Sequence, residues 1–222
     1  MSVPANHIPE SGPDILRLPA RNREHRIVVV KQVKQVVDKK LKYLLDGLSV
    51  NVADALFEEM LHLDESDALS RHFNIMRAIR TENHTFREEF LSLMNLSWAY
   101  LVNVKDRQPL PDAPAELVPD IKRFNDRNVN HYKVLLEEIR CRFSELVQAD
   151  LAFHPLLPGN FYLSFWFATA RMSLSYEERR LLLPLFHRFV MDRFGQVLSV
   201  ASLVLEDLLI EPCEAGTYQP LP

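Results

Sequence analysis

The chain has 222 residues, of which 47% are hydrophobic, and its formal net charge is −4. This content is enough for a substantial core, which excludes a disordered protein, and no stretch reaches the roughly 18 apolar residues of a membrane span. The sequence holds 2 cysteines whose separation matches no metal or redox motif, so we expect a cytoplasmic protein without structural disulfides.

Glycine is scarce and proline is common, with 5 and 14 residues respectively. β-Hairpin turns and phosphate-binding loops both depend on glycine, so helices joined by proline-containing loops are favoured. The first 23 residues contain four prolines and little periodic hydrophobicity, which predicts a flexible basic arm. From Ile27 apolar residues recur every three or four positions, which predicts a helix that ends at Gly47. Asn51 or Ser49 then caps a second helix, "VADALFEEMLHL".

Positive charge is concentrated near the N-terminus. From Arg17 to Lys42 there are nine Lys or Arg and two acids, so this segment carries +7 and the rest of the chain −11 (−4 − 7). Such a segment attracts nucleic acid or an acidic protein, but on a helix it is also the ordinary solvated face. We favour the solvated face and keep the binding segment as an alternative.

Two further helices are expected before the middle of the chain. Leu69, Phe73 and Met76 form a helical stripe that we expect to end at Thr81, and a second stripe runs over residues 86–101. The first half therefore predicts four helices.

A proline-rich segment separates the two halves. "KDRQPLPDAPAELVPD" has four prolines in sixteen residues, which predicts a linker. Beyond it, residues 121–146 predict one helix of about seven turns. "FYLSFWFATARM" is apolar on all sides and predicts a helix buried in the centre of the bundle. Ser175 and Glu178 form a capping-box pattern at the start of the next helix, where Pro184 predicts a kink and Gly195 a bend or a break.

Histidines in the first half raise the question of a metal site. A site assembled from His62, Asp64, His72 and His84 is one interpretation, because imidazole and carboxylate groups bind zinc. Zinc-binding histidines on one helix usually stand four residues apart, and no two of these have that spacing. The alternative, which we favour, is that each histidine lies half-buried at the edge of the bundle. We predict no metal and no cofactor.

A row of arginines lies in the same stretch. Arg77 and Arg80 are three residues apart and Arg71 precedes them, so the row can bind a phosphate or a partner's carboxylates through forked hydrogen bonds. The alternative, which we favour, is pairing with acids of the same chain: Glu58, Glu59 or Glu82.

The motifs of common catalytic sites do not occur in the sequence. No serine has the flanking glycines of a hydrolase nucleophile, and no glycine-rich loop ends in a lysine and a hydroxyl residue. Neither Cys141 nor Cys213 has a glycine-rich or histidine-bearing neighbourhood. Adjacent carboxylates such as Glu137 and Glu138 point about 100° apart on a helix and make no catalytic dyad. The sequence therefore predicts a protein that is not an enzyme.

Two stretches resemble a family of uncharacterised, all-helical proteobacterial proteins. Residues 54–58, "DALFE", are similar to a DDALFELA-like helix of that family, and Phe73, Met76, Arg77 and Arg80 are similar to its YF-x-AMR-x-LR-like helix. Later segments such as "HPLLPGNFYLSFWFA" look like its later helices in the same order, so the resemblance covers most of residues 40–210. It implies a helical fold and a shortened family member. It implies no activity, and the thymidine phosphorylase label sometimes attached to the family has no matching residues here.

We therefore expect an all-α bundle of seven or eight helices, in one bundle or two packed lobes. The expected divisions are an arm over 1–23, a first lobe over 24–104, a linker over 105–119, a second lobe over 120–211 and a tail over 212–222.

The leading functional hypothesis is a non-enzymatic regulatory or adaptor protein that binds another protein, since aromatic and arginine side chains dominate interface energetics. The competing hypothesis is a nucleic-acid-binding regulator that uses the basic segment 17–42. Association of identical subunits is a further expectation, and a membrane is not an expected partner. For Trp98 we favour a core position over a contact. The candidate contact residues are Arg17, Arg21, Arg23, Arg26, Lys31, Lys34, Arg77, Arg80, Trp98 and Tyr100.

Overall fold

The computed structural model describes residues 23–102 and 114–208, and all regular structure in these ranges is helical. The predicted all-α fold is thereby confirmed. The elements are α1 (Arg23–Met60), α2 (Ser66–Val102), α3 (Val118–His131), α4 (Lys133–Val147), α5 (Pro158–Thr169), α6 (Tyr176–Phe189), the 3-10 helix η1 (Met191–Arg193) and α7 (Phe194–Asp207).

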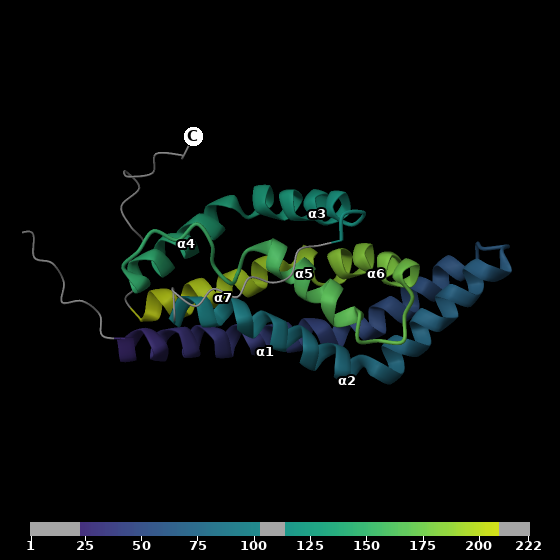
Figure 1. The fold of residues 1–222 in the computed structure, drawn as a ribbon, viewed down its shortest axis with the longest axis horizontal. Helices are drawn as coiled ribbons and strands as arrows, with labels where there is room; N and C mark the ends of the chain where they lie inside the picture. Colours follow the sequence, from purple (N-terminus) through teal and green to yellow (C-terminus); the bar gives the residue numbers. More distant parts are fainter. Residues whose placement is uncertain (1–22, 103–113, 209–222) are drawn as a thin grey trace, which may run out of the picture.

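Helices α1 and α2 form a long antiparallel hairpin along one side of the molecule. They have 38 and 37 residues, so each is roughly 55 Å long. The remaining helices pack over only part of this length, and the tip of the hairpin projects beyond α6 (Figure 1). The hairpin therefore has a supported part and a free part.

The predicted helix ends at Gly47 and Thr81 are wrong, and the first half has two helices rather than four. Val52, Ala55 and Leu56 are buried on the side that earlier residues of α1 also bury, and this packing outweighs the roughly 1 kcal/mol cost of a helical glycine. The hydroxyl groups of Ser49 and Thr81 donate to carbonyls of their own helices instead of capping a new helix. Ser49 Oγ donates to the Asp46 carbonyl at 3.0 Å, and Thr81 Oγ1 donates to the Arg77 carbonyl at 2.9 Å.

The single helix predicted over residues 121–146 is also wrong, because the chain breaks at Tyr132. Tyr132 has φ −104° and ψ 19°, which ends α3 and lets α4 start in a new direction. The Tyr132 ring packs edge-on against Phe194 at 5.8 Å and lies over Gly195, where a Cβ atom would stand 2.8 Å from Cε1 of the ring. The break lets α3 pack on α5 while α4 packs on α7.

One hydrophobic core runs through both halves of the chain. Helix α5 lies at its centre, nine of its twelve residues are buried, and the predicted central helix is confirmed. Phe165 stacks on Phe186 of α6 at 4.2 Å and meets Phe86 of α2 edge-on at 5.8 Å. The lobe boundaries stay predictions, and the arm to residue 22, linker residues 105–113 and the segment from residue 209 lie outside the described residues.

The capping box at the start of α6 is confirmed. The Glu178 amide donates to Ser175 Oγ at 3.3 Å, and the Ser175 amide donates to Glu178 Oε2 at 2.7 Å. Burial alone would raise the pKa of Glu178, but hydrogen bonds from Ser175 and from Asn74 of α2 lower it. Pro184 lies inside the continuous α6, and the chain separates into α6 and α7 at η1, just before Gly195.

Candidate functional site

A groove opens between α1 and α2 on the hairpin, and we name it the α1–α2 groove. Its volume is about 540 Å³. Two exposed apolar side chains line it: Val50 of α1 is 63% exposed and Phe73 of α2 is 59% exposed. Exposed apolar side chains that share one groove mark a contact surface more often than a random surface does. The residues that line it are Ser49, Val50, Ala53, Phe73, Met76, Arg77, Ile79, Arg80 and Asn83.

Two of the predicted arginines, Arg77 and Arg80, lie on this groove and are exposed. Arg77 Nη2 donates to Asn74 Oδ1 at 2.6 Å, and Asn74 in turn donates to Glu178 of α6 at 2.8 Å. This chain of bonds orients Arg77 from a neighbouring helix while its other donors face solvent.

The pairing of these arginines with acids of the chain, which we favoured from the sequence, is wrong. Neither Arg77 nor Arg80 forms an ion pair with another described residue. Two of the expected acids are used elsewhere: Glu59 faces His72 of α2 at 3.2 Å, and Glu82 accepts the Ser173 amide at 2.8 Å. Both guanidinium groups therefore lie on the groove without an ion pair to any described residue.

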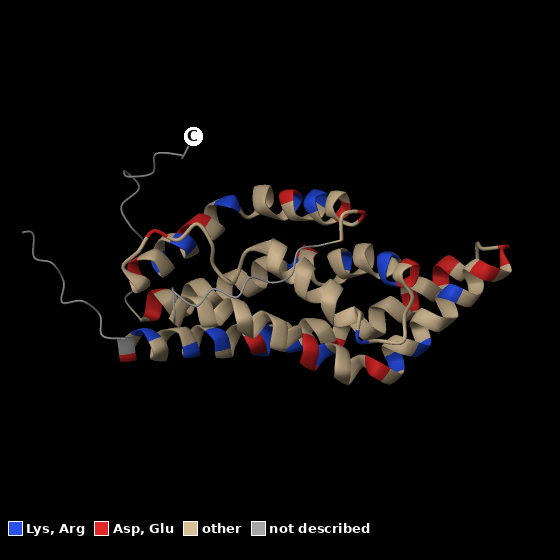
Figure 2. Ribbon diagram, in the orientation of Figure 1, with Lys and Arg blue, Asp and Glu red and all other residues tan. Residues whose placement is uncertain are grey.

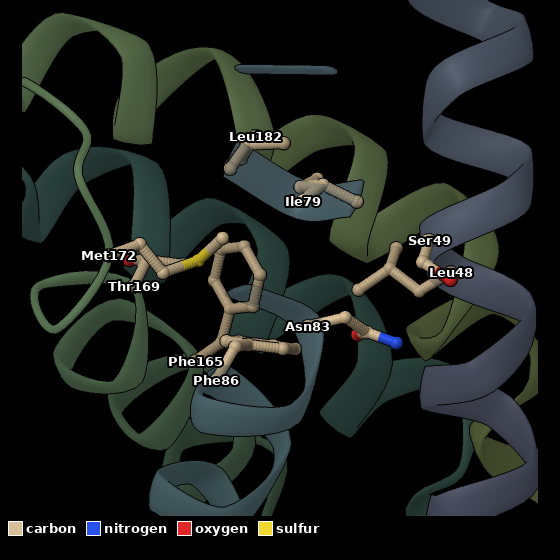
Figure 3. Close-up of a pocket in the computed structure, with 9 residues that line it drawn as sticks. All are labelled: Leu48, Ser49, Ile79, Asn83, Phe86, Phe165, Thr169, Met172 and Leu182. Atoms are coloured by element: carbon tan, nitrogen blue, oxygen red, sulfur yellow. The ribbon is translucent and has the colours of Figure 1, made fainter. Parts of the chain in front are cut away.

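Below the groove a narrow apolar slot reaches the core (Figure 3). Ser49, Ile79 and Asn83 line both the slot and the groove, and in Figure 3 the Asn83 amide extends toward α1. The slot has a volume of about 10 Å³, roughly the minimum for one water molecule. The groove thus has a close-packed floor. It suits a molecule laid along the surface better than one enclosed in the protein. The other lining residues of the slot are Leu48, Phe86, Phe165, Thr169, Met172 and Leu182.

The alternative metal site of His62, Asp64, His72 and His84 does not assemble in the described residues, where no three His, Cys, Asp or Glu side chains come together to hold an ion. His72 is buried, its Nδ1 lies 2.8 Å from the Ala68 carbonyl, and its Nε2 faces Glu59. Since a carbonyl and a carboxylate both only accept, Nδ1 donates to Ala68, and Nε2 donates to Glu59 when the ring carries a second proton. His72 therefore joins α2 to α1, while His62 and His84 are exposed rather than half-buried.

The two aromatic candidates have different surroundings. Trp98 is 2% exposed and packs edge-on against Phe143 at 6.1 Å, so its core position is confirmed and its candidacy as a contact residue is wrong. Tyr100 is half-buried against Phe153 at 5.7 Å.

The basic candidates are only partly described. Lys31 is exposed on α1, Lys34 pairs with Asp38 one turn later, and Arg26 is half-buried with no hydrogen-bond partner for its Nε. Arg17, Arg21 and the side chain of Arg23 lie outside the described residues.

A buried polar chain that sequence reasoning missed joins three helices at the other side of the core. Asn128 Nδ2 of α3 donates to the Tyr162 hydroxyl of α5 at 2.7 Å, and this hydroxyl lies 2.6 Å from His187 Nδ1 of α6. On the far side of the ring, His187 Nε2 is 3.5 Å from Asp192 Oδ1. These residues have no motif spacing, so no sequence signal could have found them.

The protonation of this chain follows from its geometry. Because Asn128 donates to the phenol oxygen, Tyr162 donates its one proton to His187 Nδ1, and neutral His187 carries its own proton on Nε2. Burial raises the pKa of Tyr162 and lowers the pKa of His187, so both groups stay neutral. Tyr162 is fully buried, so this hydrogen-bond chain links the three helices inside the core and does not form an open site.

A second polar cluster joins α4 to the segment that follows it. Arg140 holds Glu137 through two hydrogen bonds of 2.9 and 2.7 Å and reaches Asp150 at 2.6 Å. Its charge and hydrogen bonds lower the pKa of Glu137, although burial opposes this. His154 lies nearby, 1% exposed, and its Nδ1 accepts the Leu156 amide at 3.3 Å. Burial, and then the Arg140 charge, lower the pKa of His154 to about 3.

Comparison with known proteins gives one match. The family model described as "Protein of unknown function (DUF1631) N-terminal domain" matches residues 26–207. No curated protein and no solved structure matches. Among the described helices, none is long and apolar enough to cross a membrane. The proteobacterial origin and the shortened architecture expected from the sequence stay predictions.

Proposed function

Because this chain belongs to the DUF1631 family, whose function is unknown, we propose its function from its own geometry: a non-enzymatic regulatory or adaptor protein that binds another protein in the α1–α2 groove. The observation that carries the proposal is the groove itself, which exposed Val50 and Phe73 line together with Arg77 and Arg80, two arginines that form no ion pair with another described residue. We also propose a cytoplasmic location.

The groove matches the chemistry of an amphipathic helix with acidic side chains. Burial of a fully exposed side chain of this kind is worth about 1.5–3 kcal/mol, so Val50 and Phe73, which are 63% and 59% exposed, would contribute about 1–2 kcal/mol each. Arg77 and Arg80 can each bind a carboxylate through two parallel hydrogen bonds, which fixes the orientation of the partner. An apolar groove with charged edges is the usual receptor for a helix that presents anchors at every third or fourth residue.

The experiment is capture of proteins from the lysate of the native host, with tagged wild-type protein and with single variants. Phe73→Ser and Arg80→Glu should each reduce retention of the partner by at least about tenfold, because each removes one half of the proposed contact. Val134→Ser is the matched control, since Val134 is 83% exposed on α4, away from the groove. A partner retained equally by Arg80→Glu and by the wild type would refute the proposal.

The second candidate function is binding of nucleic acid by the basic segment 17–42. The observation that favours it is the set of exposed lysines on α1, which includes Lys31, Lys39 and Lys42 (Figure 2). Phosphate contacts release counterions, so replacing Arg21, Arg23 and Arg26 by alanine should weaken binding and reduce its dependence on salt. An unchanged salt dependence would contradict this candidate.

A further inference from the structure

Helix α1 carries a regular apolar stripe on its exposed side. Val36, Tyr43, Val50 and Phe57 follow each other at intervals of seven residues, so they share one face of the helix. Val36 is half-buried, and the other three are 66%, 63% and 55% exposed. We name this stripe the α1 seam. A heptad of exposed apolar residues is the pattern by which one helix packs along another.

Gly47 lies in the middle of the α1 seam, and nothing within the chain requires a glycine there. A Cβ atom at Gly47 would meet only the side-chain amide of Asn51, at the ordinary contact distance of 3.7 Å. The glycine nonetheless lies inside a helix of 38 residues, where it costs roughly 1 kcal/mol relative to alanine. Close approach of a second backbone is the remaining physical use for a residue without a side chain at this position.

The charges that flank the seam differ between its two ends. Lys39 and Lys40 lie on this face, eight and seven residues before Gly47. Asp54 and Glu58 lie on it seven and eleven residues after Gly47. Figure 2 shows the same polarity, with basic residues along the first half of α1 and acidic residues toward the hairpin tip. A parallel copy of α1 would place like charges together. An antiparallel copy would pair them with opposite charges.

The basic end of the seam also has a place for a large side chain. A groove of about 550 Å³ lies between α1 and α7, lined by Val36, Lys39, Lys40, Tyr43, Val200, Leu203 and Val204. Leu203 is 58% exposed in it. Lys39 and Lys40 are the charged side chains that line this groove. The acids of α7, Glu206 and Asp207, follow Val204 in the sequence and do not line it.

We propose that two copies of this chain form a symmetric dimer, in which their α1 helices pack antiparallel along the seam and cross at Gly47. With the two-fold axis at Gly47, Lys40 lies opposite Asp54 of the partner subunit, since the two positions stand seven residues on either side of the axis. The partner's Phe57 then meets the groove between α1 and α7. The contact is self-complementary, as a two-fold interface must be, and it closes at two subunits.

The proposed dimer does not rest on the proposed function. Val50 belongs to both the α1 seam and the α1–α2 groove, so in the dimer the partner's α1 would cover part of it, and Phe73 would be the main apolar contact left in the groove. Phe73 and Arg80, which test the groove, belong to α2 and not to the seam. The two proposals can therefore fail separately.

Sedimentation equilibrium over loading concentrations from about 1 μM to about 1 mM tests the dimer, because this range covers weak and strong association. The wild type should be a concentration-dependent dimer. Gly47→Gln should raise the Kd of the dimer at least about tenfold, because the new side chain would stand where the two helices cross. The monomer should stay folded, since the side chain has open space within the chain and glutamine has a higher helix propensity than glycine.

Charge reversal gives a test that a general loss of stability cannot imitate. Lys40→Glu and Asp54→Lys should each weaken the dimer by about tenfold or more, because each variant places like charges together at both ends. An equimolar mixture of the two variants should dimerise again, as should the double variant, because both restore opposite charges. Lys42→Glu, on another side of α1, is the control and should dimerise like the wild type.

Two results would overturn the proposal. One is a wild-type chain that stays monomeric over the whole concentration range. The other is a dimer that Gly47→Gln and Lys40→Glu both leave intact, or that the mixture of charge variants fails to restore.

Discussion

Acid should destabilise this protein through His154, and the size of the effect follows from its burial. The ring is 1% exposed and its pKa in the folded protein is about 3, against an ordinary value of 6.5. Between these values the unfolded chain binds a proton that the folded chain does not. The stability that the neutral His154 ring contributes is therefore fully present above pH 6.5 and is lost as the pH falls toward 3.

The loss amounts to about 1.4 kcal/mol for each unit of pH below 6.5, or about 2 kcal/mol between pH 6.5 and pH 5. Urea unfolding at pH 7, 6 and 5 measures it directly. The informative variant is His154→Asn, because its side-chain oxygen can still accept the Leu156 amide while no longer binding a proton. Its stability at pH 7 should be lower, since packing against Phe143 is lost, but its dependence on pH should be weaker.

The control is His84→Asn, at an exposed position of α2, which should keep the acid sensitivity of the wild type. Burial also lowers the pKa of His187, so some acid sensitivity should remain in His154→Asn. If His154→Asn lost stability with falling pH as steeply as the wild type, the buried neutral imidazole would not be its cause.

Two further predictions concern the core. Tyr162→Phe removes the hydroxyl that donates to His187 Nδ1 at 2.6 Å and accepts from Asn128, so unfolding in urea should show a loss of stability of about 1–3 kcal/mol. An unchanged midpoint would count against the polar chain. Gly195→Ala should destabilise the otherwise wild-type protein, because the new methyl group clashes with Tyr132. The same change should stabilise the Tyr132→Ala variant by up to about 1 kcal/mol. A double-mutant cycle without coupling would contradict the close contact.

Local signals in the sequence predicted those features that depend on neighbouring residues. The capping box of Ser175 and Glu178 needs only a spacing of three, and the central position of α5 follows from its uniformly apolar composition. The helix ends expected at Gly47 and Thr81 were wrong because the low helix propensity of these two residues is outweighed by buried residues on both sides of each. The sequence alone does not show this burial.

Features that depend on distant residues were not predictable in the same way. The break at Tyr132 exists because that ring meets Phe194 and Gly195, more than 60 residues later. At the candidate site, the sequence indicated Arg77 and Arg80 but favoured pairing within the chain. The two arginines lack these ion pairs because Glu59 and Glu82 bind groups that lie far from them in the sequence.

The projecting tip of the α1–α2 hairpin has a consequence for how the molecule opens. Near the tip the two helices have only each other to pack against, and the His72–Glu59 contact is one of the few polar links across them. Backbone amides there should exchange with deuterium faster than those of the same two helices beneath α5, even though each helix is continuous. Helices α1 and α2 would thus each combine a slowly exchanging half with a half that opens readily. A protein that binds the tip would slow exchange where it is fastest.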